Sequence, residues 1–405
     1  MTPTPVVAGD YSRFSCPNQD CPDFNHPGRG NIRHRSWRGQ EGTIERLRCT
    51  TCAEEFSERA GTLMARSKLP EEKAEQLLKC QRWGVCDAGT ADICGVDIKS
   101  VHHFQQVASQ RAKEHHQQVV QQVEVAGVQL DEAHSKRRPK QVEWIHTALA
   151  MGSLFILWVE FGPRTTATAA RLIAQVVACL RGLPVFLTDG WKPYLTALLQ
   201  VVGRVYHPRR KGKVGRYPHP RLVAPDGLFY AQVVKRRNQA GRLVAVTQRV
   251  IFGGPRRFFT ELKRRGLGTT IQTAFMERWY ATLRGWVAAL RRRTRCLSWS
   301  SRRHQGRIWL IVSLYNWVLP HQSLRHNKRS CTPAMAIGLT DHVWSYHEYI
   351  WLPVHEDLKG KQRMEERITQ LLTPALPDRA TEKAVAGALP KKAKKKRKQP
   401  AKKAA

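Results

Sequence analysis

The sequence lacks any apolar run close to the ~20 residues that a membrane-spanning helix needs. Its first residues, MTPTPVVAGDYSRF, also lack the basic start and apolar core of a secretory signal. Both absences argue against a membrane or secreted protein, and we expect an intracellular chain. In that compartment the ten cysteines are expected to be metal ligands or reduced core residues rather than disulfides.

Acidic residues are scarce. The chain has 32 Asp and Glu against 68 Lys and Arg, and its net charge is +36. Between residues 262 and 340 it carries fifteen basic residues and a single acid, Glu277. Such a balance makes a polyanion the expected partner, as for ribosomal proteins, DNA-binding regulators and nucleic-acid enzymes. With 405 residues, 41% of them apolar, the chain is long enough for two or three domains with real cores.

Two close cysteine pairs mark a first unit, residues 1–66. One pair is separated by four residues, the other by two, and twenty-seven residues lie between the pairs. Each short spacing presents two thiolates to one face of an ion, which predicts one structural Zn²⁺ bound tetrahedrally. A unit this small buries little core, so the metal would supply folding free energy. The four predicted ligands are Cys16, Cys21, Cys49 and Cys52, with His26 and His34 as alternatives.

Residues 67–122 have the pattern of a helical unit. A small residue at Ala91, a glycine at Gly95 and an apolar anchor at Val101 suit a helix-turn-helix, whose second helix would begin at Asp97. An ordinary helical hairpin with a polar face fits the same pattern. The side chains expected to reach DNA are Lys99, Ser100, His102, His103 and either Gln105 or Gln106.

From residue 123 to 350 the pattern is that of an α/β domain. Three strands, a helix, a strand and a second helix follow one another, and this order predicts a mixed sheet. Residues 208–257 open with a basic Gly/Pro loop and continue as two alternating strands, which we interpret as an inserted or appended β-hairpin. Residues 351–405 are predicted to be a linker and a basic disordered tail that ends in KKAKKKRKQPAKKAA.

Acidic residues at strand ends suggest a second metal site. Asp131 is expected to end the first strand and Asp189 to end LPVFLTD, so the two carboxylates converge if these strands are neighbours. Two Mg²⁺ or Mn²⁺ ions would relieve their repulsion and support phosphoryl transfer. Glu277 would be the third ligand, and Arg284, two helical turns further on, would hold a phosphate.

Each of these acids has a simpler alternative role. Asp189 could cap the helix that follows it, and Glu132 could replace Asp131 as the first ligand. Glu277 could pair with Arg278 or Arg284 on an exposed helix face.

Several segments together resemble bacterial insertion-sequence transposases of the insertion-sequence-1 type, the InsA/InsB kind. CPNQDC and RCTTCAEEFSERAGT are similar to the zinc segment of that family, and QLDE, LTDGWKPY and TAFMERWYATLR are similar to the three segments of its Asp-Asp-Glu triad. YNWVLPHQSLRH and TPAMAIGLTDHVW resemble its C-terminal segment. The chain departs from the family where AHSKRRPK follows the first acid pair and where Tyr280 stands in place of a frequent Asn.

The resemblance implies a ribonuclease-H-like core in which Asp131, Asp189 and Glu277 form the metal-binding catalytic triad, followed by the basic Arg284. We therefore expect a multidomain protein: a zinc ribbon, an all-α helix-turn-helix, and an α/β ribonuclease-H-like mixed sheet with an inserted hairpin.

The expected function is that of a DNA transposase in the bacterial cytoplasm, associated with the nucleoid. It would bind the terminal inverted repeats of its element and join them to target DNA, as a homo-oligomer in a synaptic complex and without a membrane partner. The alternatives are a catalytically inactive DNA-binding regulator and a ribonuclease-H-like nuclease that cuts without joining.

Overall fold

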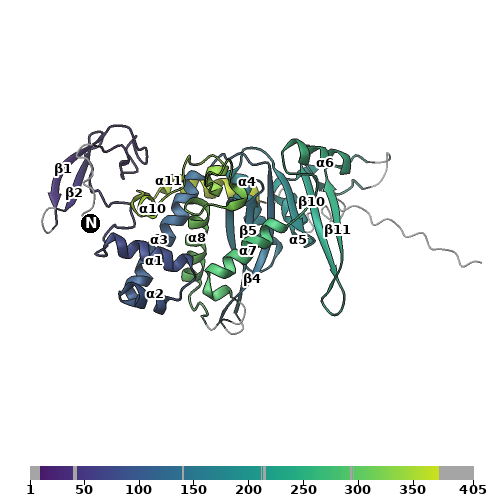
Figure 1. Cartoon of the computed structure of the whole chain (residues 1–405). Helices are drawn as coiled ribbons and strands as arrows, with labels where there is room; N and C mark the ends of the chain where they lie inside the picture. The colour runs from purple at the N-terminus through teal and green to yellow at the C-terminus, as the bar shows by residue number, and fades with distance from the viewer. Residues whose placement is uncertain are drawn as a thin grey trace, which may run out of the picture.

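The computed structural model describes residues 10–39, 43–138, 141–210, 212, 216–291, 294 and 296–373, without the side chains of residues 136–138. It contains a small sheet, a group of helices and a large sheet in sequence order (Figure 1). The predicted basic tail lies outside the described residues. Within these ranges no helix is both long enough and apolar enough to span a membrane.

The first unit is a three-stranded antiparallel sheet of β1 (Ile32–Arg38), β2 (Ile44–Cys49) and β3 (Glu55–Ser57). Its apolar core is small and separate from the rest. Phe14, Ile32, Leu47 and Phe56 pack around three of the predicted zinc ligands. So small a core supports the expectation that a metal contributes to the stability of this unit.

The helical unit comprises α1 (Glu71–Arg82), α2 (Asp87–Cys94) and α3 (Ile98–Val119). The turn between α2 and α3 lies where the sequence placed it. Gly95 ends α2 with a left-handed φ of 59°, which glycine adopts without strain. Asp97 begins α3 by accepting the backbone N–H of Lys99 at 2.7 Å, and Val101 is fully buried.

The large sheet is mixed, as predicted. Its strands lie in the order β11-β10-β7-β4-β5-β6. The pairs β4–β5, β5–β6 and β10–β11 are antiparallel, whereas β7 runs parallel to both β4 and β10. The strands are β4 (Gly127–Arg138), β5 (Gln141–Ala150), β6 (Ile156–Gly162), β7 (Val185–Asp189), β10 (Phe229–Arg237) and β11 (Leu243–Phe252).

Helices cover both faces of this sheet. The alternation of side chains along the strands shows which helices lie on each face. Gln129, Asp131, Leu187 and Asp189 lie on one face, because side chains alternate along a strand and paired residues share a face. On this face Leu187 packs with α6 (Pro255–Arg264) and Gln129 bonds to α7 (Ala274–Trp286). On the opposite face lie α4 (Thr166–Cys179) and α5 (Pro193–Val202), which contact each other.

The remaining described elements connect or flank these layers. The long α8 (Ser301–Trp317) packs between α3 and β6. The shorter elements are β8 (Arg204–Tyr206), β9 (Arg221–Val223), η2 (Ala288–Leu290), η3 (Gln322–Leu324), α9 (Pro333–Ala336) and α10 (Tyr346–Trp351).

Three expectations are corrected by the structure. The hairpin within 208–257 is not separate from the α/β domain, because β10 pairs in parallel with β7 and both its strands belong to the large sheet. Asp131 does not end its strand, since β4 continues to Arg138 alongside β5. The segment after residue 350 is not only a linker and tail, because α11 (Leu358–Leu372) packs on α4 and α5. Alternation within a strand does not reveal its neighbours, so the sequence pattern missed the parallel pairing.

Candidate functional site

The four predicted zinc ligands come together in the first unit. Their Sγ atoms all lie within 4.8 Å of one another. The distance is 3.4 Å from Cys16 to Cys52 and 4.0 Å from Cys21 to Cys49. A tetrahedral ion with metal–sulfur bonds of about 2.3 Å separates its sulfurs by about 3.8 Å. The cluster therefore fits a structural Zn²⁺.

The local backbone explains why these thiols converge. Cys49 ends β2, and Ala53 donates its N–H back to the Cys49 carbonyl at 3.0 Å, closing a turn that carries Cys52. Burial raises the pKa of the Cys49 thiol, but hydrogen bonds from the backbone N–H groups of Cys52 and Thr51 and from the thiols of Cys16 and Cys52 together lower that pKa to about 7. The side chain of Asn31 also donates to this sulfur at 3.2 Å. These contacts thus favour the thiolate form of Cys49, the form that binds metal.

Neither histidine proposed as an alternative ligand is part of the cysteine cluster. His34 instead bonds through Nδ1 to the carboxylate of Glu45 at 2.8 Å. The four-cysteine set is therefore the candidate site in this unit.

A second cluster lies in the large sheet and contains the first two predicted triad residues. Leu130 of β4 is level with Thr188 of β7, so Asp131 and Asp189 follow side by side on neighbouring strands. One carboxylate oxygen from each of them and one from Glu132 lie within 4.8 Å of one another. Asp189 also accepts the N–H of Trp191 at 2.9 Å, so it supports the turn into α5 as well.

The three carboxyl groups repel one another in a partly buried site. Burial raises the pKa of Asp131 to about 7, and the charges of Glu132 and Asp189 add to the shift. Burial and the charge of Asp189 also raise the pKa of Glu132, against the opposing effect of Tyr194 and Arg164. A divalent cation would offset both burial and mutual repulsion, because its positive charge neutralises the neighbouring carboxylates.

Asp131 and Glu132 differ in their partners. The Glu132 side chain is 2% exposed and is held by Arg164, whose Nε lies at 2.7 Å, and by the Tyr194 hydroxyl at 2.8 Å. The Asp131 carboxylate accepts the backbone N–H of Glu132 at 2.8 Å. Of the two, Asp131 is on the face covered by α7, which favours it over Glu132 as the ligand shared with that helix.

Glu277 is near this cluster but not within it. It lies in the first turn of α7, its side chain is 58% exposed, and it forms an ion pair with Lys235 of β10. The suggested pairing with Arg278 or Arg284 is thus replaced by a partner from another element. Arg284 is exposed on the same helix. The structure therefore joins Asp131 with Asp189 and leaves Glu277 at the rim.

Two buried side chains fix the start of α7 against β4. The amide of Gln129 donates to the Gln272 carbonyl at 2.7 Å and accepts the N–H of Met276 at 3.3 Å. The Tyr280 hydroxyl donates to the Asp131 carbonyl at 2.7 Å. Sequence reasoning missed the roles of Gln129 and Lys235. A glutamine two residues before Asp131, within an apolar strand, was the available signal for the first.

The predicted DNA-binding residues of α3 are only partly accessible. Lys99 and His103 are exposed, whereas Ser100 and His102 are half-buried. His102 lies 3.3 Å from the carboxylate of Asp87, and buried Gln105 donates to the same carboxylate at 2.8 Å. Of the two glutamines proposed for this face, only Gln106 is exposed. Together, Lys99, His103, Gln106, Gln110 and Lys113 form an exposed stripe along α3.

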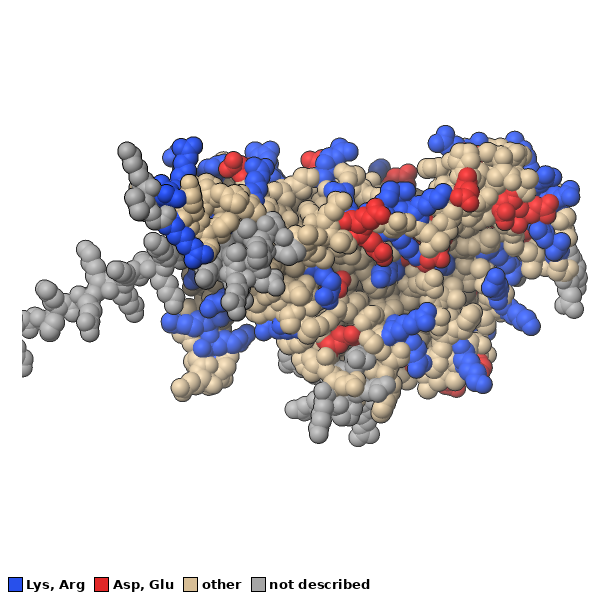
Figure 2. Space-filling model, turned by 180° about the vertical axis from the view of Figure 1, so that it is seen from behind, with Lys and Arg blue, Asp and Glu red and all other residues tan. Residues whose placement is uncertain are grey.

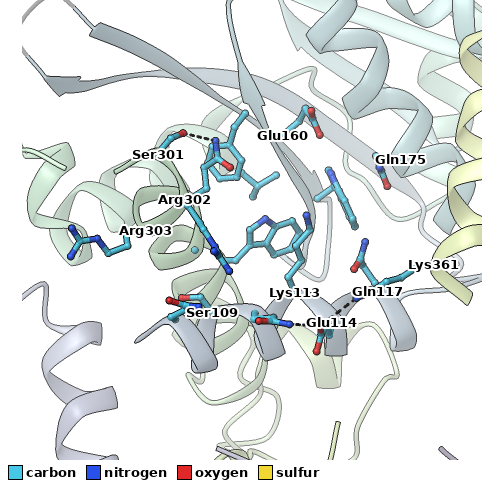
Figure 3. A pocket seen from close by; sticks show the side chains of 18 of the residues that line it. Ser109, Lys113, Glu114, Gln117, Glu160, Gln175, Ser301, Arg302, Arg303 and Lys361 are labelled. Atoms are coloured by element: carbon cyan, nitrogen blue, oxygen red, sulfur yellow. Dashed lines mark hydrogen bonds and ion pairs between the residues drawn. The ribbon is translucent and has the colours of Figure 1, made fainter. Parts of the chain in front are cut away.

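That stripe leads into a groove of about 890 Å³ between α3, β6, α8 and α11. In Figure 3 Lys113 and Glu114 of α3 line one side of the groove and Glu160 of β6 the opposite side, with Arg302 and Arg303 of α8 at one end. Glu114 bonds to Lys361 of α11 at 3.3 Å. The groove contains no residue of either candidate metal cluster.

A scan of protein-family models and a search of curated proteins both found no match to this chain. The geometry of the two clusters and the charge of the surface therefore carry the functional argument.

Proposed function

We propose that the protein is a DNA transposase whose large sheet is a ribonuclease-H-like catalytic domain. The observation that carries the proposal is that Asp131 of β4 and Asp189 of β7 lie level on neighbouring parallel strands. Glu277 lies on α7, which is hydrogen-bonded to β4. The element order supports it as well, because three antiparallel strands precede the helix and the strand that bears the second acid. The resemblance to insertion-sequence-1-type transposases points to the same triad.

In this proposal Asp131, Asp189 and Glu277 hold two divalent cations, Mg²⁺ or Mn²⁺. Such ions, when bound, stabilise the attacking and leaving oxygens of an in-line displacement at phosphorus. The exposed Glu277 side chain leaves Lys235 and turns toward Asp131 and Asp189. Lys235 and Arg284 are then free to neutralise phosphate oxygens beside the reacting centre.

Two displacements at phosphorus account for transposition. Water attacks a phosphodiester at the element end, the bond from phosphorus to the 3′ oxygen breaks, and a 3′-hydroxyl is released. That hydroxyl then attacks a phosphodiester of the target. A bond forms from the 3′ oxygen of the element to phosphorus, the bond from phosphorus to the target's own 3′ oxygen breaks, and a target 3′-hydroxyl leaves, without a covalent protein–DNA intermediate. The carboxylates would hold the ions in both steps. Because water and then the 3′-hydroxyl are the nucleophiles, no protein side chain is needed in that role.

The rest of the chain would hold DNA. Figure 2 shows basic side chains over much of the surface seen from behind, with acidic ones in smaller groups. The zinc unit and the exposed stripe of α3 would recognise the terminal inverted repeats, with base edges read by Lys99 and His103. Holding two ends and a target requires several copies, so we propose a homo-oligomeric synaptic complex.

The test is a strand-transfer assay with the purified full chain, an end fragment from the DNA flanking the gene and a plasmid target. Wild type should join the fragment in Mg²⁺ but not in EDTA, and Glu277→Gln should abolish joining. Glu366→Gln, at an exposed position of α11, serves as a matched control that keeps activity. Joining by Glu277→Gln at the wild-type rate would refute the triad.

One observation favours an inactive DNA-binding regulator instead, namely the pairing of Glu277 with Lys235 outside the carboxylate cluster. Tight binding of the end fragment without cleavage or joining in Mg²⁺ or Mn²⁺ would support that function. Cleaved but never joined products would indicate a nuclease.

A further inference from the structure

The hairpin of β10 and β11 extends beyond the rest of the large sheet. β10 pairs with β7 only as far as Val233, which is level with Asp189, and from there it pairs with β11 alone. Figure 1 shows this two-stranded extension projecting from the sheet. We call residues 234–249 the arm. It therefore begins beside the carboxylate cluster.

One face of the arm continues the face that carries the catalytic acids. Asp189 and Val233 are paired, so they share a face, and Lys235 and Arg237 follow on that face because side chains alternate. The ion pair of Lys235 with Glu277 agrees with this placement. The opposing β11 residues on the same face are Leu243, Val246 and Gln248, whereas Arg236 and Thr247 lie on the other face.

The arm is exposed and has no negative charge. The segment from residue 227 to 260, which includes the arm and its flanks, carries seven basic residues and no Asp or Glu. Leu243 is 52% exposed and Val246 is 53% exposed. Cations combined with uncovered aliphatic side chains suit a polyanion that also has apolar surface. Nucleic acid has both, in its phosphates and in its sugars and bases.

The dimensions of the arm match a DNA strand that runs outward from the carboxylates. At about 3.4 Å per residue, Lys235 lies about 7 Å and Arg237 about 14 Å beyond the level of Asp189. A duplex strand carries one phosphate per about 3.4 Å of helix axis, so Arg237 is level with roughly the fourth nucleotide from the reacting phosphate.

We propose that the face of the arm carrying Lys235, Arg237, Leu243 and Val246 binds the DNA nucleotides that adjoin the reacting phosphate. This inference rests on the proposed function, which places that phosphate at Asp131 and Asp189. Arg237 contacts the phosphate backbone of the DNA, and Leu243 and Val246 pack against its sugars or bases. A second copy of the chain is a poorer partner, because pairing of two arms would bring two surfaces without any Asp or Glu together, and like charges repel.

The test compares two double variants of the full chain that remove the same charge from opposite faces. Arg237→Ala with Val246→Asp alters the proposed DNA face, and Arg236→Ala with Thr247→Asp alters the other face at neighbouring positions. Affinity for a fluorescein-labelled duplex from the DNA flanking the gene is measured over a series of salt concentrations, together with strand transfer. Thermal unfolding verifies that both variants fold, and Arg237→Lys, which retains a charge, is a second variant on the proposed face.

We expect the first variant to bind the duplex at least about tenfold more weakly. The slope of the logarithm of its binding constant against the logarithm of salt concentration should become shallower by about one to two, since each lost phosphate contact reduces this slope by about 0.9. The second variant should stay within about threefold of wild type. Equal losses in both variants, or none in either, would overturn the proposal while wild-type joining upholds the proposed function.

Two further outcomes separate the inference from the function on which it rests. A face-specific loss of binding in a wild type that never cuts DNA would support the arm and refute the catalytic assignment. A wild type that binds no DNA would overturn both. A change of oligomeric state in the first variant with unchanged DNA affinity would show that the arm is instead a protein interface.

Discussion

Substitution of Asp131 by Asn should stabilise the protein at alkaline pH. The folded state raises the pKa of this carboxyl from 3.8 to about 7, first through burial and then through the charges of Glu132 and Asp189. An acid whose pKa is higher in the folded than in the unfolded state destabilises the fold when it ionises. Stability is therefore unaffected below pH 3.8 and is lost as the pH rises from 3.8 to about 7.

The magnitude follows from the size of the shift. Each pKa unit corresponds to about 1.36 kcal/mol, so ionising this buried carboxyl destabilises the fold by an upper limit of about 4 kcal/mol at pH 8. At pH 5 the same calculation leaves only about 2 kcal/mol. Asn has nearly the same shape as Asp and keeps an oxygen for the N–H of Glu132, so the variant should recover most of this free energy.

The assay is thermal unfolding of wild type and Asp131→Asn at pH 5 and pH 8, with and without Mg²⁺. Without metal at pH 8 the variant should melt up to roughly 8–16 °C higher, since about 1 kcal/mol corresponds to about 2–4 °C in a domain of this size. Mg²⁺ should stabilise wild type and leave the variant nearly unchanged, because ligand binding to the folded state adds stability. Exposed Asp226→Asn is the control. A variant equal to or below wild type at pH 8, or a difference that does not depend on pH, would refute the reasoning.

Further predictions concern the zinc cluster and buried amides. Cys49→Ser should lower bound zinc, measured by elemental analysis, from one ion per chain to none and expose residues 43–57 to hydrogen exchange, whereas Cys296→Ser should change neither. Gln129→Leu strands the Met276 N–H at the start of α7, so we expect a loss of about 1–3 kcal/mol in denaturant unfolding and slower strand transfer; unchanged values would contradict its anchoring role. Asn316→Leu leaves the N–H and carbonyl of Ile156 without their bonds and should cost about 2–4 kcal/mol, with no effect expected if water replaces the amide.

The local features of the chain could be anticipated from short stretches. The spacing of Cys16, Cys21, Cys49 and Cys52 was enough to predict that they share one site, because a thiolate pair within a tight turn points to one ion whatever surrounds it. Alternating and helical apolar periods likewise located β5, β6, β7, α4 and α5, since burial of one face imposes the period.

Other features depend on which strands become neighbours, and no local pattern contains that information. The hairpin of residues 229–252 alternates as any amphipathic hairpin does, and only pairing with β7 makes it part of the large sheet. The same pairing places Lys235 near Glu277 and gives the arm a face that continues from Asp189. Periodicity specifies the face of a strand but not its partner.

The residue types of the candidate ligands, the short spacing of each cysteine pair and the large positive charge can all be read from the chain, because they are properties of neighbouring residues or of composition. Three relations emerge only on folding: Asp131 and Asp189 are level, Glu132 is held by Arg164 and Tyr194, and Glu277 pairs with Lys235. These relations join residues far apart in the chain. They follow from strand register and from helix packing, which are decided by burial of the whole core rather than by any one segment.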